Sequence, residues 1–342
     1  MKCFIILALF FSFSRVCSGQ EMDYSVYHRA INNAERCFFI ENQSDSCLAY
    51  YDNAFGAFDF VFVKDLVNAA QIAFFSKKPF EKYLIRGFEL GLKPEHLERI
   101  PLFRPVYNDL YNNKDLQAAY AAGREKYLKR IDFNYLLKVY DLCIQDQVDK
   151  SKSEQEYTAI KKDNLKTLLR WIGEKGFPGD KIIGISDRNI FAEIGSPQLD
   201  IDTRKLKFSN RLDYYSAEQV SLSSAYIIIL MVHDQCTFPQ MDSLLKKLVL
   251  KGEIHPGEAG LLYDNMFRNV NSKHYSCAIP NASKGLFYLN QFCNYSTLQC
   301  TEEQADALRA QWFLGPLRVQ KAKKKYEQES GFKLFYGFWG CT

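Results

Sequence analysis

The chain has 342 residues, of which 47% are hydrophobic and 15% aromatic, so it can bury a sizeable core. Its formal net charge is +4, a near-neutral balance that gives no reason to expect binding to nucleic acid. The one basic cluster, at residues 321–325, falls late in an expected helix, where lysines favour the carboxyl end of the helix dipole.

Residues 1–19 have the pattern of a secretory signal peptide. Lys2 supplies a positive start, residues 3–13 form the apolar segment, and the small residues at 17–19 favour cleavage before Gln20. A lipoprotein signal acylated at Cys17 is the alternative, although residues 14–16 lack the residues typical of such a site. No later apolar run reaches the roughly 20 residues that span a bilayer. We therefore expect an exported, soluble protein, periplasmic or secreted, with no membrane span.

Residues 20–150 are expected to form a helical, repeat-like domain. Apolar residues at helical spacing predict helices over 47–58 and 64–75, and Pro79 begins another that Gly91 ends. The alternation of small and large residues followed by a proline-containing turn resembles tetratricopeptide-type helical hairpins. The match covers about one and a half repeats, whereas a solenoid needs about three. A generic helical bundle is the alternative.

A long helical stretch over residues 116–149 leads to a polar segment at 149–156, where we place a domain boundary. Residues 157–342 are expected to form a mainly helical domain with a few short β-strands, at 181–185, 274–279 and 285–289. Residues 195–216 are polar and irregular, which is long for a loop without a function. A last helix over 302–329 is expected to break near Gly315 and Pro316.

The most apolar stretch, residues 225–267, predicts three consecutive helices. The first, over residues 221–234, has no polar face before His233, which indicates a helix buried on all sides. Pro239 begins the second helix, and Gly252 ends it in the manner of a C′ residue. Pro256 opens the third. We therefore expect the first of these helices to lie at the centre of the core.

Ten cysteines are present, eight of them after the leader, and an even number in an exported chain indicates disulfides. Cys37 and Cys47 flank a turn-forming segment between two expected helices, so we predict a disulfide between them. The pairing of the other six stays open. No CxxC pair occurs, which argues against a zinc ribbon.

Candidate chemistry centres on His233, Glu253 and His274. A histidine at the end of a buried helix needs a hydrogen-bond partner or a ligand, so His233 is either a satisfied core residue or part of a site. Metal ligands or an acid–base pair could come from three histidines and the acids near them, although their spacing requires neither. The histidines are His233, His255 and His274, and the acids are Asp234, Glu253, Glu258 and Asp264. Known signatures for metalloproteases, nucleophile elbows and phosphate loops are absent from the sequence, and no motif predicts a cofactor.

A set of short motifs resembles an uncharacterised bacterial domain family over residues 160–280. The motifs are a Gly-Phe-Pro turn at 176–178, a buried helix ending in His233, a Lys-Gly-Glu-Ile-x-Pro segment at 251–256 and Lys-His-Tyr at 273–275. Ser276 and Cys277 stand where the family has Gly and Thr, so the last motif departs from the pattern. The resemblance implies a domain and no established activity.

From these observations we expect an exported protein of the interaction or scaffold type, whose partner is another protein or a peptide bound by the helical N-terminal module. The alternative is a hydrolase-like enzyme with a site around His233, Glu253 and His274. The sequence leaves the oligomeric state open.

Overall fold

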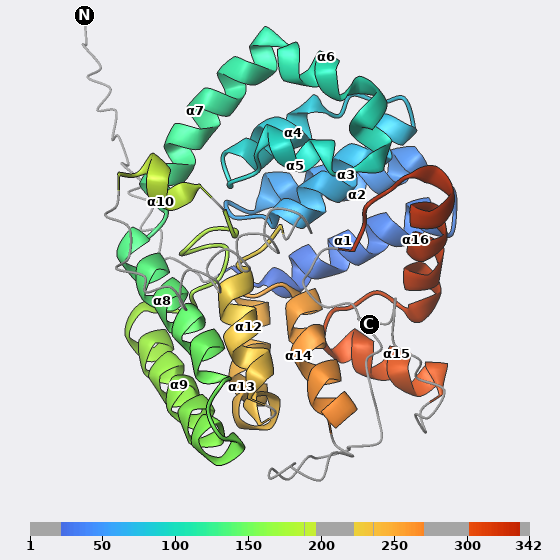
Figure 1. The fold of residues 1–342 in the computed structure, drawn as a ribbon. Helices are drawn as coiled ribbons and strands as arrows, with labels where there is room; N and C mark the ends of the chain where they lie inside the picture. Colours follow the sequence, from blue (N-terminus) through green and yellow to red (C-terminus); the bar gives the residue numbers. More distant parts are fainter. Residues whose placement is uncertain (1–21, 188, 196–221, 235, 270–300, 336–342) are drawn as a thin grey trace, which may run out of the picture.

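The computed structural model describes residues 22–187, 189–195, 222–234, 236–269 and 301–335, with only the backbone of residues 265–269. These residues are mainly helical and include no β-strand (Figure 1). The N-terminal helices are α1 (Tyr24–Phe39), α2 (Ser44–Ala57), α3 (Val63–Phe75), α4 (Glu81–Phe88), α5 (Pro94–Glu98), the 3-10 helix η1 (Pro101–Val106), α6 (Tyr107–Asn112) and α7 (Lys114–Arg130). The later helices are α8 (Phe133–Asp149), α9 (Glu154–Lys175), α10 (Ile190–Glu193), α12 (Ala225–His233), α13 (Thr237–Leu250), α14 (Pro256–Asn269), α15 (Glu302–Gln311) and α16 (Leu317–Ser330).

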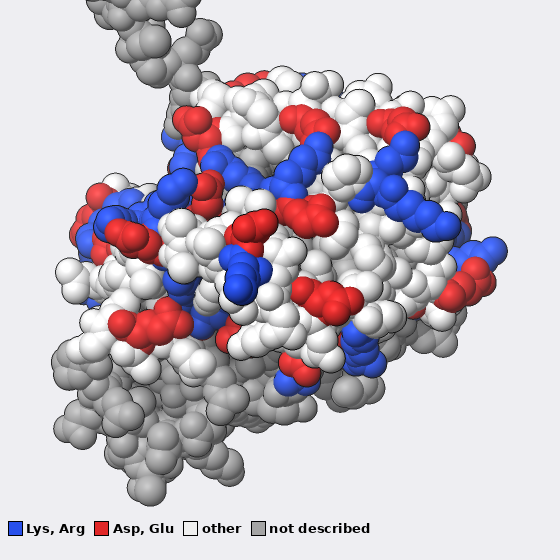
Figure 2. All heavy atoms as spheres, turned by 90° about the horizontal axis from the view of Figure 1, so that it is seen from above, with Lys and Arg blue, Asp and Glu red and all other residues white. Residues whose placement is uncertain are grey.

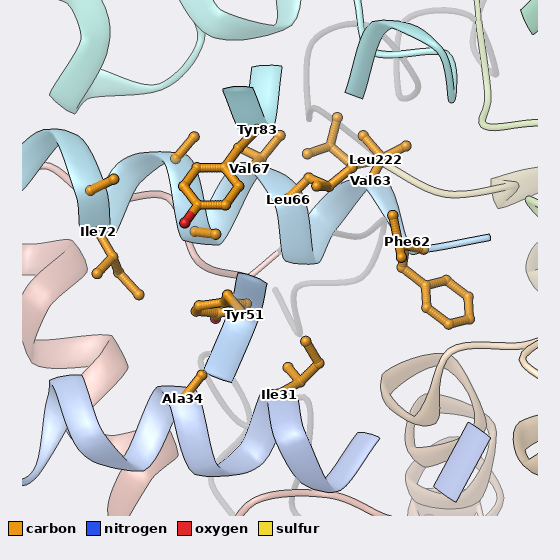
Figure 3. Close-up of a cluster of buried hydrophobic side chains, with 14 of the residues drawn as sticks. Ile31, Ala34, Tyr51, Phe62, Val63, Leu66, Val67, Ile72, Tyr83 and Leu222 are labelled. Carbon is orange, nitrogen blue, oxygen red and sulfur yellow. The ribbon is translucent and has the colours of Figure 1, made fainter. Parts of the chain in front are cut away.

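The first hydrophobic core is organised around α3, which is buried over residues 63–73. Helices α2 and α4 pack against α3, and Figure 3 shows Ile31 and Ala34 of α1 pointing towards it. The same core contains Val319, Phe332 and Leu334 from the end of the chain, and α1 contacts α16. The two ends of the described chain therefore pack together.

The second core is organised around α12, as the apolar run predicts. Every residue of α12 before His233 is buried, and the helix contacts α8, α9 and α14. The predicted helix after Pro239 begins slightly earlier, at Thr237. Gly252 follows the end of α13 with a φ of +65°, a left-handed conformation that glycine adopts without the strain of a Cβ.

Three local expectations are corrected. Residues 181–185 form a turn instead of a strand, because the amides of Ile182 and Ile183 donate to the Gly179 carbonyl (both 3.0 Å). The stretch 116–149 is divided between α7 and α8, since Asp132 caps α8 by accepting from the Tyr135 amide (2.9 Å). Helix α9 begins inside the expected linker, at Glu154, where Ser153 starts a capping box.

The mainly helical fold class is confirmed, whereas the tetratricopeptide-type arrangement is not established. Helices α1 and α2 do pack as neighbours, as do α3 and α4. The packing departs from the order of the predicted domains, because α8 before the proposed boundary and α9 after it both belong to the second core. The predicted leader and the β-strands at 274–279 and 285–289 lie outside the described residues. No helix of the described ranges is both long and apolar enough to cross a membrane.

Candidate functional site

A pocket of about 60 Å³ lies where the N- and C-terminal parts of the chain meet. Its walls come from α1, α3, the start of α14, the turn between α15 and α16, α16 itself and residues 334–335. A cavity volume of roughly 10–15 Å³ holds one water molecule, so the pocket holds a group of about four non-hydrogen atoms. It therefore suits a small ligand or the end of one side chain.

A polar stripe on α3 forms the floor of this pocket. Lys64 and Asn68 are spaced by one helical turn, and Asp65 lies beside them in an otherwise largely apolar helix. The three side chains belong to residues that are 6%, 4% and 3% exposed, respectively. Polar groups this deeply buried need hydrogen-bond or ion-pair partners within the protein.

Asp65 is held by two side chains, from Tyr27 and His255. The Tyr27 hydroxyl donates to Oδ2 at 2.8 Å, and Nε2 of His255 lies 3.5 Å from Oδ1. Burial raises the pKa of Asp65, but His255, Tyr27 and Lys64 outweigh burial and leave the pKa below its usual value. Asp65 is therefore an ionised carboxylate at neutral pH.

The hydrogen bonds of His255 define its tautomer. The amide of Gly257 donates to Nδ1 at 2.9 Å, so Nδ1 must be the unprotonated acceptor. The other nitrogen, Nε2, is the one directed at Asp65. Both ring nitrogens are thus directed at protein atoms, and the ring has no lone pair left for a substrate in this geometry.

His28 borders the pocket from α1 and is neutral. Its Nε2 lies 3.0 Å from the Val249 carbonyl, which can only accept, so Nε2 carries the proton. Burial, reinforced by the nearby His255, lowers the pKa of His28 to about 4. The remaining nitrogen, Nδ1, is therefore an acceptor, and no described residue forms a hydrogen bond with it.

The cationic side chains of the pocket each have a carboxylate nearby. Lys64 pairs with Glu258 in a buried ion pair, and Lys323 pairs with Glu35. Arg309 donates from Nε to the Gly315 carbonyl at 2.6 Å, and Asp306 lies 3.9 Å from the same nitrogen. These three cations are thus balanced within the protein, whereas Asp65 has no Lys or Arg ion-pair partner among the described residues.

Asp180 and Glu258 are interacting carboxyl groups whose pKa values shift in opposite directions. Burial, with the nearby Glu258 charge, raises the pKa of Asp180 to about 7, while Lys64 outweighs burial and holds the pKa of Glu258 below its usual value. Asp180 accepts from the Ser224 amide at 2.6 Å through Oδ1, and its Oδ2 has no partner in the described structure. The pair links the Gly-Phe-Pro turn and the start of α12 to α3 and α14.

Asn68 is a polar side chain of the pocket with one atom that lacks a hydrogen-bond partner in the described structure. Its Oδ1 is completely buried and has no hydrogen-bond partner among the described residues. A buried amide oxygen without a donor costs about 1–3 kcal/mol, and such an atom in a natural protein calls for an explanation.

His233 occupies a different place, at the carboxyl end of α12. Its Nδ1 lies 2.5 Å from Oδ2 of Asp146 on α8, and Lys150 approaches Nε2 at 2.7 Å. Burial lowers the pKa of His233 despite the opposing influence of Asp146, so the ring is neutral and bridges the two side chains. These contacts match the interpretation of His233 as a satisfied core histidine.

Glu253 contacts the opposite end of α12. Its Oε2 accepts a hydrogen bond from the amide of Phe177 at 3.2 Å. The carbonyl of the next residue, Pro178, accepts from the hydroxyl of Ser224, which directly precedes α12. Nine helical residues rise by about 13 Å, which separates this end from His233. His274 lies outside the described residues, so the three candidate residues are not assembled by the contacts described.

The predicted disulfide between Cys37 and Cys47 is not formed. Both cysteines, like Cys143, are buried and free, while Cys236 is disulfide-bonded. The thiol of Cys37 hydrogen-bonds to the Glu41 side chain instead, and burial raises the pKa of both thiols. Protonated thiols in an apolar environment are poor nucleophiles, so neither is a catalytic candidate.

Sequence reasoning did not identify the α3 pocket, although part of its signal was present. The spacing of Lys64, Asn68 and Gln71 places three polar residues on one face of a helix whose other positions are largely apolar. The pairing of this face with His255, nearly 200 residues later, had no local signal.

Comparison with known proteins adds no assignment, since no family model, curated protein or solved structure matches this chain.

Proposed function

We propose that this protein is an exported binding protein and that the group it recognises enters the pocket between α1, α3 and α16. The observation that carries the proposal is a polar pocket whose floor holds Asp65, a carboxylate with no Lys or Arg ion-pair partner among the described residues. Such a carboxylate in a pocket can accept hydrogen bonds from a ligand.

Binding is supported over catalysis by the chemistry of the pocket walls. Both ring nitrogens of His255 are directed at protein atoms, so it cannot serve as a general base without a rearrangement. The described residues that line the pocket include no Ser, Thr or Cys that could act as a nucleophile.

The partner in this proposal is a protein or peptide that inserts one side chain or chain end. The pocket is too small to enclose more than a few heavy atoms. One face of the molecule, seen in Figure 2, carries Lys and Arg interspersed with Asp and Glu, which suits a mixed protein surface better than a polyanion. Export is supported by the leader-like residues 1–19.

The test compares two substitutions of the same kind. Gly315 lies at the pocket wall, where an added Cβ would meet Oδ1 of Asn32 at 3.3 Å, so Gly315→Trp should obstruct the pocket. Gly56 lies on α2 with nothing within 4 Å of an added Cβ, so Gly56→Trp is the matched control. Each mature protein is exposed to a library of peptides derived from exported proteins, and the retained peptides are identified by mass spectrometry.

We expect the parent and Gly56→Trp to retain the same peptides and Gly315→Trp to lose them, with all three proteins folded by circular dichroism. Retention by Gly315→Trp at the parental level would show that recognition occurs elsewhere on the molecule. Recovery of a mature protein beginning at Gln20 outside the cytoplasm tests the export component separately.

A further inference from the structure

We propose that the contact between α1 and α13 is an acid-sensitive junction, held together by the neutral ring of His28 and loosened when that ring takes up a proton. The device belongs to the fold itself and needs no ligand. Its basis is the position of His28 between two helices that belong to different hydrophobic cores, together with the groups that surround the ring.

His28 connects two parts of the chain that are far apart in sequence. The residue lies on α1 and is 2% exposed, and its Nε2 donates to the Val249 carbonyl at 3.0 Å. Val249 is in the last turn of α13, and its carbonyl also accepts from the Gly252 amide at 3.1 Å. The Tyr24 ring covers Gly252, since a Cβ added there would lie 2.3 Å from the ring. A hydrogen bond and a close packing contact thus join α1 to the end of α13.

The two joined helices belong to different hydrophobic cores. Ile31 and Ala34 of α1 lie in the first core, whereas Leu245 and Leu248 of α13 lie in the second. Each core can therefore keep its own packing while the contact between the helices loosens. Local opening of this kind is separate from unfolding of the whole protein and has its own, smaller free energy.

The ring of His28 is surrounded mainly by other rings. The centroids of Phe62 and Phe313 lie 6.1 and 5.9 Å from its own. His255, just before α14, lies 6.3 Å away with its ring nearly perpendicular. A proton taken up by His28 would therefore place a charge in a buried position beside a second histidine.

Titratable and charged groups face His28 from its own helix and from the elements around it. Near the ring they are Asp23, Tyr24, Tyr27, Asp65 and His255, and α13 contributes the uncharged Val249 carbonyl. The cations that border the same pocket each have a carboxylate nearby: Lys64 has Glu258, Lys323 has Glu35, and Arg309 has Asp306.

The balance of these influences disfavours the charged ring. Burial, reinforced by His255, lowers the pKa of His28 to about 4, against the opposing influence of the Val249 carbonyl, Asp65 and Asp23. A solvent-exposed histidine titrates at about 6.5. Between about pH 6.5 and pH 4 the closed junction therefore binds fewer protons than an open one. Its stabilisation is fully present above about pH 6.5, and opening becomes about tenfold more favourable for each pH unit below that value.

The junction also affects the pocket, because His28 is part of the pocket wall. Loosening the contact between α1 and α13 would move this wall. A peptide held in the pocket should therefore be released at acidic pH, a consequence that rests on the proposed binding function.

Replacing His28 by glutamine tests the junction itself. The glutamine amide can still donate to the Val249 carbonyl but does not titrate in this pH range. His96→Gln is the matched control, because burial lowers the pKa of His96 to about 4 as well, while its Nδ1 accepts from the Lys93 amide at 3.1 Å. Hydrogen exchange of the mature proteins is measured by mass spectrometry at pH 5, 6 and 7 and corrected for the intrinsic exchange rate.

We expect the opening equilibrium of residues 245–255 to rise about tenfold from pH 6 to pH 5 in the parent and in His96→Gln, and to stay nearly constant in His28→Gln. Helix α9, which does not contain the junction, should keep its protection throughout. A rise of the same size in His28→Gln would overturn the proposal, and so would a parallel loss of protection in α9, which would mean global unfolding.

A second measurement does not depend on the folding of any variant. Proton NMR of the histidine rings gives the pKa of His28 in the parent, and titration above about pH 6 in the folded protein would overturn the proposal. Peptides retained by the parent at neutral pH should be released at pH 5, and retention at pH 5 with an open junction would refute the coupling to the pocket. A parent that retains no peptide at neutral pH refutes the binding function, while the exchange result decides the junction by itself.

Discussion

Replacing His233 by leucine tests how the second core is held together. In the native protein the neutral ring donates from Nδ1 to Oδ2 of Asp146 and accepts from Lys150. Asp146 is 1% exposed, so the carboxylate depends on protein donors. After His233→Leu, Asp146 keeps two donors from outside α8, the Asn164 amide at 3.1 Å and the Tyr157 hydroxyl at 3.3 Å.

The size of the effect follows from the group that is left behind. Loss of one donor to a buried charged group costs about 1–3 kcal/mol, partly offset by the apolar surface that leucine buries. For a protein of this size each kcal/mol lowers the melting temperature by about 2 °C, so we expect a decrease of about 2–6 °C. His233→Gln should cost less, about 1–2 kcal/mol, because its amide can still donate to Asp146.

The assay is thermal unfolding of the mature protein, followed by circular dichroism at neutral pH. Lys150→Met is the matched control, since it removes the other partner of His233 from an exposed position and should change stability by less than about 0.5 kcal/mol. A melting temperature of His233→Leu at or above that of the parent would refute the reasoning. The histidine would then belong to a functional site instead of the core.

Two further predictions concern Asp180 and Gly252. The pKa of Asp180 rises to about 7 in the folded protein, so between about pH 4 and pH 7 the native state binds more protons than the unfolded chain. The stability that Asp180 contributes is therefore lost as the pH rises through that range. Asp180→Asn should therefore gain stability relative to the parent from pH 5 to pH 8, by about 1–3 kcal/mol in urea unfolding, and a pH-independent difference would contradict this. Gly252→Ala should lower stability by about 2–4 kcal/mol, because its φ is +65° and the new Cβ would lie 2.3 Å from the Tyr24 ring. Gly56→Ala, with nothing within 4 Å, should stabilise by up to about 1 kcal/mol, and equal effects at the two glycines would contradict the packing argument.

The sequence by itself determined the helical class and the place of the most buried helix. The apolar run ending at His233 has no polar face, and hydrophobic burial alone requires such a helix to lie inside, as α12 does. Proline and glycine also marked helix boundaries, because their backbone preferences act within one turn: Pro256 begins α14, and Gly252 follows α13 in a left-handed conformation.

Only the tertiary structure decided which polar residues meet. Asp65 on α3 and His255 just before α14 are brought together by tertiary packing, and contacts between residues so distant in the chain leave no periodic signal in the sequence. Tertiary hydrogen bonding also overrode local preference at residues 181–185, which form a turn despite their β-branched residues. Cys37 and Cys47 were placed correctly on neighbouring helices, but thiol direction depends on side-chain packing, and the Cys37 thiol contacts Glu41 instead.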